Sequence, residues 1–287
     1  MLDITPVIFL GFCKMIFIDE SGEFLREPVL TLDPKITTQD DPFDRWVVRT
    51  IEQMGLPDLK VFSAGPLTHP DTVLRYKSEN GEYSYLGLEI KKLNADARGN
   101  DPRGMTLDYN STIPCGTFRV YKSSGEHLDV KGYYFYALLD HLVDQLERRI
   151  YTFVLCDGDL LNDDVELYVR SKTANISEYG HGPYGEGSIR KRAMYLYPNP
   201  LNSKIPELAR QVSLIHASPN LEMTYPELVL THTINRKKTD GTEGRFHIYK
   251  HASAIDKPAN VPVIGMFIEC AERGPKKRSA YKFVLRE

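Results

Sequence analysis

The chain has 287 residues, a length that suits one large domain or two small ones. Apolar residues make up 41% and charged residues 26%, which is ordinary for a globular protein with a sizeable core. The formal net charge is −3, which excludes a protein that coats nucleic acid through overall positive charge. A local basic cleft remains compatible with this composition.

The cysteines and the N-terminal segment narrow the class of protein further. The four cysteines are far apart and none belongs to a Cys-x-x-Cys pair. This spacing argues against structural zinc and against a disulfide framework, and it favours a reducing cytoplasm. The apolar run from Pro6 to Ile18 contains Lys14 and is too short to span a bilayer. It predicts one or two buried strands and no membrane partner.

A helix is predicted over residues 42–54. Asp41 suits its N-cap, Pro42 suits its first turn and Gly55 suits its C-terminal stop. Its apolar residues recur at helical spacing and form one stripe: Phe43, Trp46, Val47, Thr50, Ile51 and Met54. A short strand is predicted to follow at residues 59–62.

Two further strands are predicted at about 71–77 and 83–92. Asn80-Gly81 lies between them, and this dipeptide is the strongest short-range signal for a hairpin. Within the second strand, Glu89 and Lys91 are two residues apart and therefore share one face. The residues between and before them, Leu88 and Ile90, point to the other face, which is expected to belong to the core.

The register of this hairpin decides whether Asp71 meets Glu89. A two-residue turn at Asn80-Gly81 would place Asp71 opposite Ile90, on the wrong face. A three-residue loop with Gly81 in the left-handed conformation places Asp71 opposite Glu89. The second register brings the two carboxylates together. Because adjacent carboxylates repel each other unless a hard cation such as Mg²⁺ lies between them, this register favours a metal site. A lysine beside that cation can orient a water for hydrolysis of a phosphodiester.

Pro70-Asp71 followed by Glu89-Ile90-Lys91 resembles the signature of the PD-(D/E)XK nuclease superfamily, which is most familiar from type II restriction endonucleases. The resemblance covers about residues 40–157; the alternative is an ordinary hairpin with a charged exposed face. It implies that Asp71, Glu89 and the Ile90 carbonyl hold Mg²⁺, and that Lys91 orients the attacking water. The family often places an acidic residue after an aromatic one near the start of the first helix, as Asp44 stands here. Stabilisation of the helix N-terminus explains Asp44 equally well.

The next segments are predicted to complete the same core. Residues 133–149 are predicted as a helix, with one apolar side made of Phe135, Leu138, Leu139, Leu142 and Leu146. A buried strand is predicted at residues 151–156. The resulting order of helix, three strands, helix and strand is that of the PD-(D/E)XK core. A long insertion at 94–131, with a strand at 117–121, separates the third strand from the second helix.

The predicted fold is α/β, with a mixed central sheet flanked by helices as in restriction endonucleases and a β-rich C-terminal part. Residues 1–287 are predicted to form a single compact unit. Its catalytic core covers residues 40–157 and its β-rich part covers residues 158–287. The short β-like runs of the latter lie near 193–197, 227–234, 245–250, 261–270 and 280–285.

Residues suited to contacts with DNA follow the Glu89 strand closely. Arg and Asn side chains are the best shaped for guanine and adenine edges, although phosphate contact or ordinary loop chemistry explains any one of them. The residues are Asn94, Arg98, Asn100, Arg103, Asn110, Ser111 and Thr112. Three basic clusters, at 190–192, 236–238 and 276–278, suit phosphate contacts or a solvated surface equally well. An acidic group at Asp157, Asp159, Asp163 and Asp164 lacks the spacing of an EF-hand.

The resemblance implies a Mg²⁺-dependent endonuclease that cuts double-stranded DNA at a specific sequence, as a bacterial cytoplasmic restriction enzyme. Because palindromic targets favour twofold symmetry, it also implies a homodimer. Two alternatives stay open. One is another nuclease of the same superfamily with a repair or resolvase role, and the other is a non-catalytic module that binds DNA or protein.

Overall fold

The structure is a computed structural model, and it describes twelve stretches of the chain. These are residues 3–37, 41–65, 68–77, 80–94, 106–109, 116–140, 146–160, 189–198, 212–237, 243–254, 273–279 and 283–286. The described part is a mixed α/β fold with a large mixed sheet and few helices. None of its helices is long and apolar enough to cross a membrane.

Two α-helices precede most of the strands. Helix α1 spans Thr5–Phe12 and continues as a π-helical turn over Cys13–Phe17, and helix α2 spans Pro42–Gln53. The first strands are β1 (Val29–Thr31), β2 (Lys60–Ser63), β3 (Thr72–Lys77), β4 (Tyr83–Asn94), β5 (Thr106–Tyr109), β6 (Thr117–Lys122) and β7 (His127–Leu139). The later strands are β8 (Glu147–Asp157), β9 (Ile189–Pro198), β10 (Ser213–His216), β11 (Leu228–Lys237), β12 (Glu243–His251), β13 (Arg273–Ser279) and β14 (Phe283–Leu285). Short 3₁₀ turns lie at Leu221–Met223 and Ala252–Ala254.

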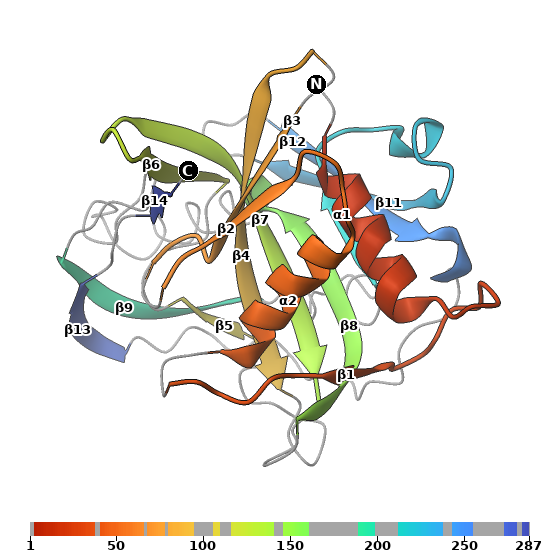
Figure 1. The fold of residues 1–287 in the computed structure, drawn as a ribbon, viewed down its shortest axis with the longest axis horizontal. Coiled ribbons are helices and arrows are strands. Elements are labelled where there is room, and N and C mark those ends of the chain that lie inside the picture. The colour runs from red at the N-terminus through yellow and green to blue at the C-terminus, as the bar shows by residue number, and fades with distance from the viewer. Residues whose placement is uncertain are drawn as a thin grey trace.

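The large sheet runs in the order β11-β12-β10-β8-β7-β4-β3-β2. Strand β1 also pairs with β8, and β6 pairs with β7 and with β14. The β4–β7 and β8–β10 pairs are parallel, whereas β3–β4 and β7–β8 are antiparallel. A separate small sheet has the order β13-β9-β5. In Figure 1 helices α1 and α2 lie across one face of the large sheet, over its central strands.

The core lies between this face and the two helices. Phe135 of β7 stacks on Phe153 of β8 with 5.0 Å between ring centroids, and Phe12 of α1 packs against Phe135 at 4.8 Å. Phe43 of α2 contacts the same ring from the other helix, at 6.2 Å. Each fully buried aromatic side chain of this kind contributes roughly 1.5–3 kcal/mol. The helices therefore bury one face of β4 and β7 and leave the other face to different partners.

The N-terminal prediction was wrong, because residues 6–17 are helical and only Ile18 forms a β-bridge, with Phe24. Pro6 lies in the first turn of α1, where its missing N–H costs nothing. Phe9 and Phe12 are fully buried. An uninterrupted apolar run fits a buried helix as well as a buried strand, so periodicity could not separate the two.

The second predicted helix, residues 133–149, was also wrong. Tyr133 to Leu139 belong to β7, and residues 147–149 begin β8. Consecutive residues of β7 are buried on both faces of the sheet, so apolar residues three and four apart did not indicate a helical stripe. The aromatic run from Tyr133 to Tyr136 is typical of a strand. Only Leu142 of the proposed stripe lies outside the described residues.

Other elements are confirmed. Helix α2 begins after Asp41, whose carboxylate accepts a hydrogen bond from Phe43 N at 3.0 Å, and Gly55 beyond its end has a φ of 61°. Strands are present where they were predicted near 59–62, 71–77, 83–92, 117–121, 151–156, 193–197, 227–234 and 245–250, and β14 lies within 280–285. The run at 261–270 lies outside the described residues.

Candidate active site

The β3–β4 hairpin brings Asp71 and Glu89 together. Thr72 lies opposite Leu88 and Lys77 opposite Tyr83, so the next position in the same register places Asp71 opposite Glu89. Gly81 has a φ of 84°, in the left-handed region that glycine adopts without strain. Both observations confirm the register predicted for a three-residue loop.

Backbone hydrogen bonds link the two carboxylates. Ile90 N donates to Asp71 Oδ2 at 2.7 Å, and Asp71 N donates to Glu89 Oε2 at 3.2 Å. Each carboxylate therefore bonds to the strand that carries the other. The side chains are held side by side where β3 begins.

Two basic side chains flank Glu89. Lys91 Nζ contacts Glu89 Oε1, as expected from their shared face. His69 Nδ1 lies 2.7 Å from Glu89 Oε2, and both of these side chains are almost fully buried. The prediction missed His69. Its only signal in the sequence is its place immediately before Pro70-Asp71, and nothing local indicates that a histidine there turns toward the next strand.

A close approach of β6 fixes the surroundings of His69. The rings of His69 and Phe118 meet edge to face at 4.8 Å between centroids. A Cβ atom on Gly87 would lie 2.4 Å from Phe118 Cδ2 and 3.2 Å from Pro70 Cγ. Only glycine at this position of β4 lets the Phe118 ring reach His69 and Pro70. The His69–Pro70 peptide bond is cis.

The two carboxyl groups have opposite pKa shifts. Burial, followed by the negative charge of Glu89, raises the pKa of Asp71 well above its usual range. Burial alone would raise the pKa of Glu89, but His69 and Lys91 outweigh it and lower that pKa to about 2. In the metal-free protein the pair therefore favours a proton on Asp71 and a negative charge on Glu89, as expected when two carboxylates share a site.

Asp44 of helix α2 belongs to the same electrostatic group. Burial and the neighbouring charge of Asp41 raise the pKa of Asp44 to about 7, and the nearby Lys91 and Glu89 also act on it. The helix thus adds a third carboxyl group to the site. Lys92, on the other face of β4, pairs with the N-cap Asp41 at 2.7 Å and has a structural role.

A divalent cation fits this donor set only with help from other oxygens. Among the residues that the structure describes, no group of three or more His, Cys, Asp or Glu side chains is arranged to hold a metal ion. Asp71 and Glu89 offer two carboxylates, and burial with the charge of Glu89 raises the pKa of Asp71. Mg²⁺ commonly binds through one or two carboxylates and keeps several waters, so the residues fit it. The Ile90 carbonyl stays a predicted ligand.

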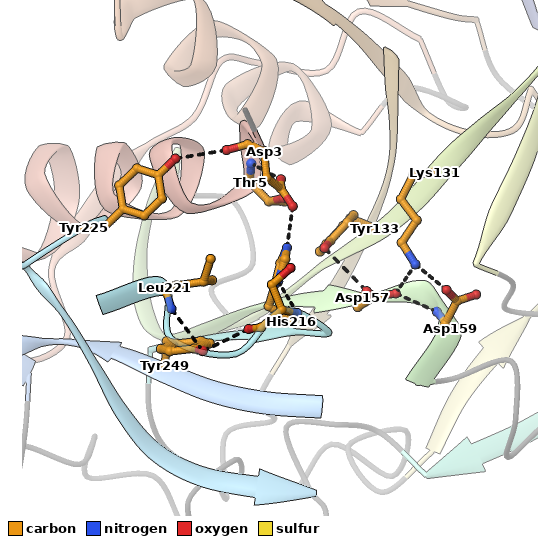
Figure 2. A network of polar contacts seen from close by, with 11 residues as sticks. Asp3, Thr5, Lys131, Tyr133, Asp157, Asp159, His216, Leu221, Tyr225 and Tyr249 are labelled. Atoms are coloured by element: carbon orange, nitrogen blue, oxygen red, sulfur yellow. Dashed lines mark hydrogen bonds and ion pairs between the residues drawn. The ribbon is translucent and has the colours of Figure 1, made fainter. Parts of the chain in front are cut away.

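A second polar network lies on the opposite face of the same sheet (Figure 2). In β7, Tyr134 neighbours Glu89 of β4 and Tyr133 neighbours Leu88, so the Tyr133 side chain points away from the site. Tyr133 donates to Asp157 Oδ2 at 3.5 Å, and Lys131 Nζ contacts Asp157 Oδ1 at 2.6 Å and also Asp159. No local pattern in the sequence indicates that Lys131 lies between these two acids.

The same network ties the N-terminal segment to β10. His216 Nε2 lies 2.5 Å from Asp3 Oδ2, and its Nδ1 accepts a hydrogen bond from Ser218 N at 2.9 Å. Because Nδ1 is an acceptor, Nε2 carries the proton and donates it to Asp3. Tyr225 donates to the Asp3 carbonyl at 3.2 Å, as Figure 2 shows. These contacts anchor the start of α1 and leave the Glu89 site untouched.

The predicted DNA contacts all belong to one segment, residues 94–112. Arg98, Asn100, Arg103, Asn110, Ser111 and Thr112 lie outside the described residues, and for Asn94 only the backbone at the end of β4 is described. Two of the three basic clusters occupy facing register positions in the small sheet, since Arg190, Lys191 and Arg192 of β9 pair with Arg278, Lys277 and Lys276 of β13. The backbone of 236–237 belongs to β11.

Comparisons with known proteins add little to this geometry. No family model and no curated protein matches the chain. A weak structural neighbour is the restriction endonuclease BglI bound to its DNA recognition sequence, which is 11% identical to this chain. The match covers 89% of this chain and 82% of that one, with a TM-score of 0.21. A similarity of this size carries no argument about fold or function, so any function has to be argued from the site.

Proposed function

We propose that the chain is a Mg²⁺-dependent endonuclease that cuts double-stranded DNA at a specific sequence, as type II restriction enzymes do. The observation that carries the proposal is the meeting of Asp71, Glu89 and Lys91 across the β3–β4 hairpin. The raised pKa of Asp71 beside an ionised Glu89 supports it, because this pair would gain from a bound cation.

Each side chain has a defined task in this proposal. Asp71 and Glu89 would hold the cation, with the Ile90 carbonyl as a further ligand. Bound Mg²⁺ would polarise the scissile phosphate and make a coordinated water more acidic. Lys91 would orient the attacking water and stabilise negative charge on the phosphate, since its ammonium already lies at Glu89 Oε1. Asp44 would support the site through its charge.

The basic clusters support a polyanionic substrate. The backbone register of β9 and β13 places the basic stretches 190–192 and 276–278 at facing positions of the small sheet. DNA phosphates suit such a concentration of basic residues. A homodimer follows from the proposed palindromic target, because twofold symmetry in the DNA favours twofold symmetry in the enzyme.

Incubation of the purified chain with plasmid and phage DNA tests the proposal. With Mg²⁺ we expect a reproducible set of discrete fragments, and sequencing their ends would identify the recognition site. Mn²⁺ should replace Mg²⁺, whereas Ca²⁺ should bind without supporting cleavage, because it tolerates looser geometry. Excess chelator should stop the reaction.

Three other results would direct the assignment elsewhere. Relaxed circles or a smear that depends on Mg²⁺ would favour a repair or resolvase nuclease of the same superfamily. Binding of DNA without cleavage under any metal would favour a non-catalytic module. Full cleavage in excess chelator would contradict a metal mechanism.

A further inference from the structure

His69 is the most enclosed basic group of the site. Its side chain is 6% exposed, whereas that of Lys91, the other basic partner of Glu89, is 24% exposed. The Phe118 ring closes one side of the imidazole. Of the two partners, His69 is therefore the one held in place by packing, and Lys91 is the one that borders solvent.

The two partners bind different oxygens of Glu89. Oε2 faces His69 Nδ1 at 2.7 Å and also accepts from Asp71 N at 3.2 Å, so this oxygen has two enclosed donors. Oε1 contacts the more exposed Lys91. A carboxylate held firmly through one oxygen has a fixed orientation, and its second oxygen is the one available to a ligand.

The other nitrogen of His69 strengthens this argument. Nε2 is buried and has no hydrogen-bond partner among the described residues. Buried polar atoms are nearly always paired, and leaving one unpaired destabilises the fold. An imidazole with one unpaired nitrogen is therefore poorly explained by stability, and its one strong contact is with Glu89.

We propose that His69 is a positioning residue: its Nδ1–H holds Glu89 through Oε2 and so presents Oε1, with Asp71, to a divalent cation. The inference rests on the proposed function of the Asp71–Glu89 site. It adds a residue that the PD-(D/E)XK pattern does not contain. Other metal sites behave in this way, since the groups that orient a ligand tune the affinity for the ion.

Two substitutions distinguish the loss of the hydrogen bond to Glu89 from the loss of the volume of the imidazole. In His69→Asn the side-chain NH₂ takes the place of Nδ1 and can donate to Glu89. In His69→Gln the NH₂ instead approaches the place of Nε2. His216→Ala is a matched control, because His216 is also a buried histidine paired with a carboxylate, but on the other face of the sheet.

Calorimetric titration of the metal-free protein with Mg²⁺, and with Ca²⁺ as a non-cleaving probe, measures the effect directly. We expect His69→Ala and His69→Gln to weaken ion binding about 10–100-fold. His69→Asn should stay close to the wild type, and His216→Ala should lower thermal stability without changing ion affinity. Unchanged affinity in His69→Ala would overturn the inference while leaving the proposed function intact.

If the wild type binds no cation, that result overturns the proposed function. The role of His69 can then still be tested by a measurement without metal. The thermal midpoints of His69→Ala, Glu89→Ala and the double variant form a cycle. If His69 holds Glu89, the double variant should melt close to the less stable single variant. Losses that simply add would show that the two side chains do not act together, and the positioning role would be wrong.

Discussion

Each face of the sheet has a cluster of two acidic residues and one lysine. On one face Asp71 and Glu89 stand with Lys91, and on the face covered by the helices Asp157 and Asp159 stand with Lys131. Each cluster combines two acids with one lysine, and each lysine contacts at least one acid. The clusters differ in the charges that surround their buried aspartate.

Lys131 contacts both of its acids, and Lys91 contacts Glu89 and also lowers the pKa of Asp71 through its charge. Burial tends to lower the pKa of Lys131, but Asp157 and Asp159 outweigh it and raise that pKa. The ammonium group of Lys131 therefore forms ion pairs with two carboxylates. At the other site the pKa of Asp71 rises well above its usual range, with Glu89 and Asp44 both contributing.

The comparison shows that composition alone does not identify a metal site. In the Lys131 cluster burial also raises the pKa of Asp157, although the charge of Lys131 and its hydrogen bond act to lower it. In the Asp71 cluster burial and the neighbouring charges of Glu89 and Asp44 raise the pKa of Asp71, with Lys91 opposing them. A divalent cation would offset this repulsion between buried carboxylates.

The largest expected effect comes from removing one acid from each cluster. Asp71→Ala or Glu89→Ala should reduce DNA cleavage on the order of 10³-fold or more, because each change removes a proposed ligand. Lys91→Ala should be severely impaired as well. Asp159→Ala is the control, since Asp159 is 49% exposed and pairs with Lys131 on the other face. Initial cleavage rates at saturating Mg²⁺ provide the measurement.

Stability and DNA binding complete this test. The Asp71 and Glu89 variants should still fold and should bind DNA at least as tightly as the wild type, because repulsion between acids and phosphates falls. Near-normal cleavage by either variant would remove the basis of the site. Equal loss of cleavage in Asp159→Ala would mean that the two clusters do not differ as argued.

A smaller effect should appear in the pH dependence of stability. Burial raises the pKa of Asp44 to about 7, so its contribution to stability is fully present below its unfolded pKa and is lost as pH rises through about 7. Asp71 acts with the same sign. Glu89 has the opposite sign and loses its contribution only as pH falls toward about 2. The metal-free protein should therefore melt lower at pH 8 than at pH 6.

Mg²⁺ should reverse this trend, because it binds the ionised acids and not the protonated ones. We expect the thermal midpoint to rise more with Mg²⁺ at pH 8 than at pH 6. Asp44→Asn should reduce the pH dependence of the metal-free protein by removing one of the titrating groups. A midpoint that Mg²⁺ leaves unchanged at both pH values would speak against a cation at this site.

The two sites also differ in how far the sequence predicted them. The hairpin of the Asp71 site was predictable because turn chemistry and strand alternation are local, and Asn80-Gly81 and the caps of α2 are local signals. The contacts of Lys131 and of His69 were not predictable, because they join segments distant in the sequence or depend on packing against Phe118. The error at β7 has a similar cause: a strand buried on both faces has no alternation to detect.

The smallest expected effect on stability concerns two glycines in matching loops. Gly81 ends the loop of the β3–β4 hairpin with a φ of 84°, and Gly125 ends that of the β6–β7 hairpin with a φ of 88°. A Cβ would meet nothing within 4 Å at Gly125 and only one side-chain atom, at 3.9 Å, at Gly81, so valine should cost roughly 1 kcal/mol or more at both, through the backbone alone.

The consequences for activity should differ. A shift of register by one residue relieves the strain at Gly81→Val, and it turns Asp71 away from Glu89. Gly125→Val lies next to β7, which pairs with β4 and with β8 on its two sides, so the acids stay in register. Denaturant unfolding and cleavage rates of the two variants should therefore show similar losses of stability with a much larger loss of activity for Gly81→Val. Equal losses of activity would mean that the Gly81 loop does not control the register of the site.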